Sequence, residues 1–234
     1  MKLTRAFAVA TIAALSLPAH FAWLEAPTEL KAGEAVKVKI GFGHEVGKSD
    51  SAVNVEGLEV WAISPSGVKT ALKPVTADNW VVADFTPRET GVHRFAFAQD
   101  RGVISQTTKG YKPGGRDVHP DAKKSMKMWR SGVTETSGKP IGLAFEAVGH
   151  RKGDRIEITV FREGKPFSGA DVALNVPGQE EAAKIGASDG NGRFTHPLAA
   201  GAKGPMLFLV TSVEPAHKGA NFDTNNVASV LLVK

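Results

Sequence analysis

The 234-residue sequence contains no cysteine and no apolar run long enough to cross a membrane. Without cysteine, the chain has neither disulfides nor thiolate ligands, so nitrogen and oxygen donors would hold any bound metal ion. The longest early apolar stretch, residues 6–17, is shorter than the roughly 20 residues that a membrane-spanning helix needs. The net charge of +5 comes from scattered basic residues. We therefore expect no stable membrane insertion and no nucleic-acid partner.

The first residues have the organisation of a secretory signal peptide. Two basic residues precede the apolar run, and Pro18 and Ala19 end it with a helix breaker and a small residue. This order predicts a signal peptide over residues 1–19 and a mature protein in the periplasm. Cleavage after Ala19 would make His20 the first residue of the mature protein, and cleavage after Ala22 is the alternative.

Short alternating segments bounded by turn residues make up the rest of the chain. In "VKVKIGFG", residues 36–43, apolar side chains recur at every second position, which is typical of a half-buried strand. Similar segments follow at short spacing, and the one plausible helix is "DAKKSMKMWR", residues 121–130. This pattern predicts an all-β fold of the sandwich type. We expect an immunoglobulin-like β-sandwich over residues 20–100, a connecting segment over 101–140 and a second β-sandwich over 141–234.

The seven histidines include the strongest candidates for metal ligands. A terminal histidine binds a divalent ion through its α-amine and its Nδ1 in one chelate ring, so a processed chain would offer two nitrogens from His20. His44 is the expected third donor, because extending the strand alternation beyond Phe42 points it inward at the rim of the core. His217, in the loop before the last strand, is the fourth candidate. Such donors suit nickel or cobalt, and also copper or zinc.

Other residues are weaker candidates for the same site. Glu25 or Glu45 could add an oxygen, although an exposed carboxylate at either position needs no metal to explain it. His93 falls on the face of two core phenylalanines, where a structural role is the simpler interpretation. His119 in a loop and His150 in a turn are explained as simply. The sequence leaves open whether these three histidines contribute ligands.

Six segments, taken in order, carry a resemblance to a known family. They are "AHFAWLE", "VKVKIGFGHE", "DFTPRETGVHRF", "GKPFSGADVAL", "SDGNGRFTHPL" and the closing "VASVLLV" that follows His217. Together they resemble a periplasmic domain-of-unknown-function family associated with nickel and cobalt uptake transporters. The resemblance implies an immunoglobulin-like first half and a prealbumin-like second half, similar to carboxypeptidase regulatory domains. It also implies a metal-handling accessory protein with no established catalysis.

Three classes of function compete at this point. The first is a periplasmic protein that captures nickel or cobalt, or copper, and relays it to a membrane uptake transporter. The second is a non-catalytic adhesion or assembly module without metal. The third is a copper enzyme in which a terminal histidine and a second histidine hold the ion. One Tyr and four Trp do not suggest an aromatic substrate surface, and no other catalytic set is evident. We expect the first class and not an enzyme.

Overall fold

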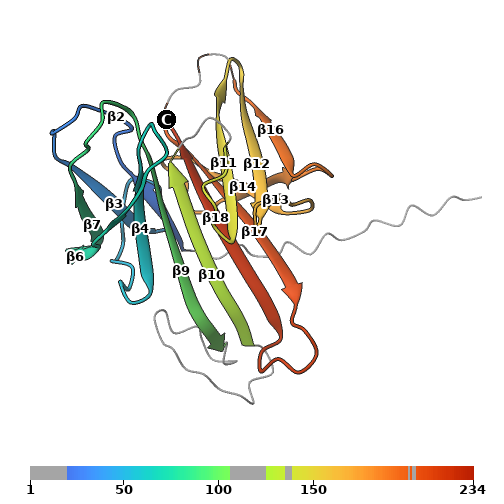
Figure 1. Ribbon diagram of the computed structural model, residues 1–234. Helices are drawn as coiled ribbons and strands as arrows, with labels where there is room; N and C mark the ends of the chain where they lie inside the picture. The colour runs from blue at the N-terminus through green and yellow to red at the C-terminus, as the bar shows by residue number, and fades with distance from the viewer. Residues whose placement is uncertain (1–19, 106–124, 135–138, 200, 202–203) are drawn as a thin grey trace, which may run out of the picture.

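The computed structural model (Figure 1) describes residues 20–105, 125–134, 139–199, 201 and 204–234. All regular secondary structure within these residues is β-strand, which confirms the predicted all-β fold. No helix in this part of the chain is long and apolar enough to span a membrane. The expected signal peptide, residues 1–19, and His119 lie outside the described residues.

The described residues contain the following strands, in chain order. The first nine are β1 (Phe21–Glu25), β2 (Glu29–Leu30), β3 (Val36–Gly43), β4 (Leu58–Ile63), β5 (Lys69–Leu72), β6 (Val75–Ala77), β7 (Trp80–Phe85), β8 (Gly91–Val92) and β9 (Arg94–Ser105). The others are β10 (Ser125–Thr134), β11 (Phe145–Lys152), β12 (Arg155–Arg162), β13 (Lys165–Pro166), β14 (Asp171–Asn175), β15 (Ala183–Ala187), β16 (Arg193–Pro197), β17 (Met206–Pro215) and β18 (Thr224–Val233).

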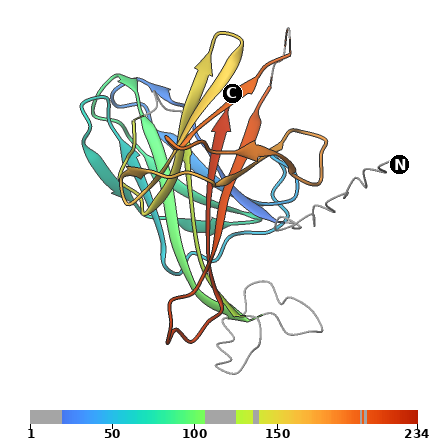
Figure 2. The ribbon, with the colours of Figure 1, turned by 90° about the vertical axis from the view of Figure 1, so that its right-hand side faces the viewer.

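The described residues form four sheets, three of which are stacked as layers, and the fourth is the two-stranded pair of β2 and β8. The middle layer is an eight-stranded sheet in the order β15-β14-β17-β18-β10-β9-β4-β5. One outer layer has the order β1-β3-β7-β6, and the other contains β11, β12 and β13, with β16 beside β12. Strands β1 and β11 both contact β10 and β18, from opposite faces of the middle sheet. Figure 2 shows that β9, β10, β17 and β18 extend beyond the outer layers at one end.

In β17 and β3 the sequence pattern matches the layer that the strand occupies. In β17 the apolar run is continuous, because Leu207 packs in the core on the β1–β3 side and Phe208 packs in the core on the β11–β12 side. Both residues are 0% exposed, as expected for a strand buried on two faces. In β3, by contrast, Val38 and Ile40 are buried, and Lys37 and Lys39, which alternate with them, are exposed. The outer strand therefore buries one face only.

Residues 125–130, the described part of the segment expected to be a helix, form a strand instead. Residues 125–134 are β10, which lies between β9 and β18 in the middle of the largest sheet and pairs in parallel with β18. Hydrogen bonding to a strand on each side outweighs a local helical spacing. The eight-stranded sheet therefore contains strands from each of the three segments that the sequence predicts. The division into two sandwich domains stays a prediction.

Candidate metal centre

His20 and His44 lie side by side at one end of the β1–β3 pair. These strands are antiparallel, with Phe21 opposite Gly43, so the residues just beyond that pair meet across the strand ends. The ring centroids of the two histidines are 3.8 Å apart, and the rings are inclined at 54°. The structure thus brings together two of the three histidines that the sequence predicts as metal ligands.

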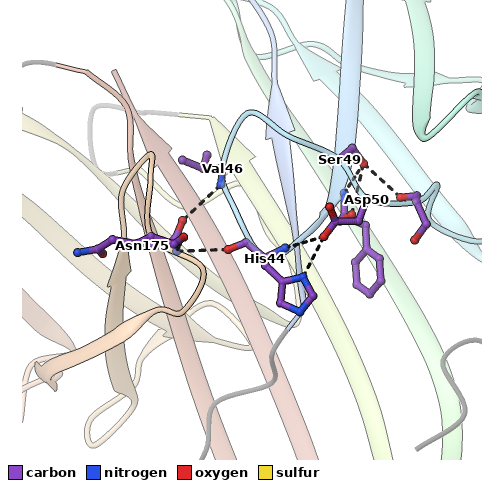
Figure 3. A network of polar contacts seen from close by, with 8 residues as sticks. His44, Val46, Ser49, Asp50 and Asn175 are labelled. Carbon is purple, nitrogen blue, oxygen red and sulfur yellow. Dashed lines mark hydrogen bonds and ion pairs between the residues drawn. The ribbon is translucent and has the colours of Figure 1, made fainter.

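Asp50 is the third member of the cluster and was missed in the sequence. One possible ligand atom from each of His20, His44 and Asp50 lies within 4.8 Å of the other two. Asp50 Oδ2 accepts a hydrogen bond from His44 Nδ1 at 2.9 Å and one from the His44 backbone N–H at 3.2 Å (Figure 3). The carboxylate therefore fixes both the ring and the backbone of His44.

The loop that follows β3 folds back on this strand, so that Asp50 lies beside the end of β3. The Asp50 N–H donates to Phe42 O at 2.9 Å, and the Phe42 N–H donates to Ser49 Oγ at 2.9 Å. Gly47 turns the chain with a φ of +89°. Gly43 leaves room for the carboxylate, since a Cβ at this position would lie 2.6 Å from Asp50 Oδ2. The glycine before His44 is the feature of the sequence that could have indicated a close approach of another side chain at this position.

The second half of the chain also holds this loop. Asn175 at the end of β14 is fully buried. Its Nδ2 donates to His44 O and its Oδ1 accepts from the Val46 N–H, each at 3.4 Å (Figure 3). Glu45 Oε1 accepts from the Gly178 N–H at 2.9 Å. Glu45, which the sequence offered as an oxygen donor, is thus engaged in joining the two halves.

The ring of His20 rests against a stack of side chains. It lies on Phe42 with 5.3 Å between centroids and an interplanar angle of 23°. The guanidinium of Arg130, in β10, lies 5.2 Å from the Phe42 centroid on the middle sheet. Gln99 Oε1 holds that guanidinium through bonds of 2.6 and 3.0 Å. The stack connects the position of the His20 ring to the central layer.

The electrostatic environment favours the protonation states that bind metal. Burial, and then the neighbouring His44, lower the pKa of His20 from its ordinary value of 6.5, against the opposing effect of Asp50. The side-chain hydrogen bond from His44 is the main cause that lowers the pKa of Asp50. At neutral pH the cluster therefore presents a neutral His20 imidazole and an ionised carboxylate.

His217, the other histidine that the sequence predicts as a ligand, does not lie in the cluster. It is exposed in the turn between β17 and β18, at the end where these strands extend beyond the outer layers, and its ring meets the Phe222 ring edge-on at 6.4 Å. Its expected role as a ligand beside His20 is not supported by this placement. Three other candidates also lie outside the cluster within the described residues: Glu25, His93 and His150.

The cluster supplies imidazole nitrogen and carboxylate oxygen, which are donors for first-row divalent metals. Because His44 Nδ1 is bonded to Asp50, Nε2 is the nitrogen of His44 left for an ion. A carboxylate bonded to the far nitrogen of a ligating imidazole orients the ring and raises its basicity. The same contact is also a half-exposed ion pair, with side-chain exposures of 39% and 38%, that needs no metal.

These features define a class: a layered all-β protein with a histidine–aspartate cluster at the end of an outer strand pair. The chain belongs to the family described as "Domain of unknown function (DUF4198)", whose model matches residues 17–210. No curated protein matches it.

Among solved structures, the chain is similar to a DUF4785 family protein from Legionella pneumophila subsp. pneumophila str. Philadelphia 1. The sequence identity is 12%, the TM-score is 0.29, and the match covers 80% of this chain and 51% of that chain. This chain therefore spans about half the length of that protein.

Proposed function

We propose that this protein binds a divalent transition metal in the periplasm and hands it over to a membrane uptake transporter. The observation that carries the proposal is the convergence of His20, His44 and Asp50, with ligand atoms within 4.8 Å. Removal of residues 1–19 as a signal peptide would add the α-amine of His20 to this set. The amine and Nδ1 of His20 then form a chelate, Nε2 of His44 adds a third nitrogen, and Asp50 orients His44.

Nickel or cobalt is the proposed cargo, with copper or zinc as the alternatives. A set of nitrogen and oxygen donors without thiolates suits all four ions in their divalent forms. The family resemblance favours nickel and cobalt over copper, although the general order of affinities favours copper. The metal is cargo in this proposal, and no catalytic step is assigned to it.

Hand-over requires a coordination sphere that a second protein can enter. His20 and His44 are only partly buried and Asp50 is exposed. A cavity of about 270 Å³ beside them is lined by His44, Glu45, Lys48, Asp50 and Glu180. An ion held by His20 and His44 would leave positions for water or for donors of the receiving transporter on this side. Such an incomplete sphere supports exchange rather than permanent storage.

The second candidate function is an adhesion or assembly module without metal. The ion pair between His44 and Asp50, and the contacts of Asn175 with the same loop, are complete without an ion. This alternative predicts that no stoichiometric metal binds to the cluster.

Isothermal titration of the protein that begins at His20 distinguishes the two functions. We expect one nickel, cobalt, copper or zinc ion per chain, and strongly reduced affinity in the His20→Ala and His44→Ala variants. His217→Ala is the matched control, because it removes an exposed histidine outside the cluster, and it should bind as the parent does. One extra residue before His20 should weaken binding without unfolding the protein. Unchanged binding by both cluster variants would refute the proposal.

A further inference from the structure

The cavity beside the histidine–aspartate cluster is larger than a bound metal ion requires. Its volume of about 270 Å³ is well above the space that one water molecule needs. It lies just below the range that is usual for small-ligand sites, roughly 300 to 1,000 Å³. His44 and Asp50 belong both to the cluster and to the lining of the cavity. A small ligand in the cavity would therefore lie next to an ion bound at the cluster.

Two charged side chains of opposite sign line this cavity without a partner among the described residues. Asp50 is bonded to His44, and Glu45 accepts a backbone hydrogen bond. The side chains of Lys48 and Glu180, by contrast, form no hydrogen bond or ion pair in the described part of the chain, not even with each other. Both residues are exposed, so each side chain is free to meet a ligand. The cavity therefore offers a ligand one cationic donor and one anionic acceptor.

The position of Lys48 is unfavourable for a bare cation. Its ammonium group lines the same cavity that borders the cluster, and it would repel a divalent ion there because the two charges have the same sign. An anionic group between them would relieve this repulsion. Water does not supply such a charge, whereas a carboxylate supplies it and also donates an oxygen to the ion. Lys48 thus favours an ion that arrives with an anionic ligand attached.

The donor set of the cluster leaves positions on the ion for such a ligand. After processing, the chain would supply the α-amine and Nδ1 of His20 and Nε2 of His44. Nickel and cobalt ions accept further donors, and a chelate of an amine nitrogen and a carboxylate oxygen keeps the nitrogen and oxygen set that suits them. The second carboxylate oxygen of this chelate can accept from Lys48, and its amine N–H groups can donate to Glu180.

We propose that the cargo is a divalent metal ion chelated by a small α-amino carboxylate, which the cavity binds together with the ion. This inference rests on the proposed function, because the cluster has to hold the metal. His20 and His44 bind the ion, Lys48 pairs with the carboxylate, and Glu180 accepts a hydrogen bond from the amine. The amino acid is bound only as a ligand of the metal, and no bond within it is broken.

Glycine and glycinamide are matched probes, because both chelate a metal ion but only glycine carries a carboxylate. The chain that begins at His20 is loaded with one nickel ion and titrated with each probe, with native mass spectrometry and the absorption bands of nickel as readouts. We expect a complex of one chain, one ion and one glycine. Lys48→Gln should weaken glycine binding about two- to fivefold, as for an exposed charge pair, and leave glycinamide binding unchanged. The same variant should bind nickel alone at least as tightly as the parent, because it removes a repulsive charge, whereas a folding defect would weaken both.

Substitutions at two adjacent glutamates complete the test. Glu180→Gln should weaken both probes, because each presents amine N–H groups to this side chain. Glu181→Gln is the matched control, since Glu181 is equally exposed but lies outside the cavity lining. If the chain binds nickel but forms no complex with glycine, or if Lys48→Gln binds glycine as the parent does, this inference is overturned and the proposed function stands. Failure of nickel to bind at the cluster would overturn both.

Discussion

Replacing Asp50 tests whether its carboxylate orients a metal-binding histidine or only forms an ordinary surface ion pair. Its carboxylate bonds to His44 at the ring and at the backbone, and both side chains are more than a third exposed. A half-exposed pair of this kind contributes about 0–1 kcal/mol to folding. Loss of a partner that orients a metal-bound histidine costs about 10- to 100-fold in metal affinity, which is about 1.4–2.7 kcal/mol. The loss of affinity in Asp50→Ala should therefore exceed the loss of stability.

The assay combines titration with nickel, cobalt or copper and urea denaturation of the metal-free protein. Asp50→Asn should fall between the parent and Asp50→Ala, because the amide keeps an acceptor oxygen but loses the charge. Asp84→Asn is the matched control, since Asp84 forms an exposed ion pair of 3.0 Å with Lys37 away from the cluster. Parent-like affinity in Asp50→Ala, or an equal loss in Asp84→Asn, would refute the reasoning.

Three further predictions follow from individual contacts. Gly43→Ala should lower metal affinity in titrations, because its Cβ would lie 2.6 Å from Asp50 Oδ2 and displace the carboxylate. Asn175→Ala should lower the free energy of unfolding in urea by about 1–3 kcal/mol, because it leaves the buried Val46 N–H and two partly buried carbonyl groups without this partner. Burial lowers the pKa of His196 below 6.5, so the unfolded chain takes up the proton first and stability falls as the pH decreases from about 6.5 towards the lowered value. His196→Phe should show a smaller decrease over that pH range, and an unchanged pH profile would contradict this cause.

The sequence predicted β3 of the outer layer directly, because this strand exposes its lysines on one face and buries apolar side chains on the other. In β3 the alternation of Val38 and Ile40 with exposed lysines marks the strand directly. The same alternation placed His44 at the strand end. It could not show that His20 lies opposite, because strand pairing depends on which segments meet in space. The position of a charged side chain in a loop, such as that of Asp50, is even harder to predict from the sequence. Asp50 reaches His44 only because the backbone of its loop bonds back to Phe42.

The strand β10 was missed for a specific physical reason. Its register with β9 shifts between Lys127 and Trp129, and such an irregularity breaks the period of two that identifies a strand. The apolar residues Met126, Met128 and Trp129 consequently lose simple alternation and suggest a helix. The contacts that make this segment a strand come from β9 and from β18, and the β18 partner of Met126 is Thr224, far along the chain.

The second half of the chain helps to fix the geometry of the cluster. Asn175 and Gly178 belong to the segment around β14, yet they hold the loop that carries His44, Glu45 and Val46. The ring of His20 rests, through Phe42, on Arg130 of the sheet shared by both halves. Within this one sheet, the His44 loop is held at β14 and the His20 ring rests, through Phe42, on β10, so a movement of β14 relative to β10 would change the separation of the two imidazoles. Under the proposed function, a receiving protein that bound the β14 end of this sheet would shift the His44 loop relative to His20 and so loosen a bound ion.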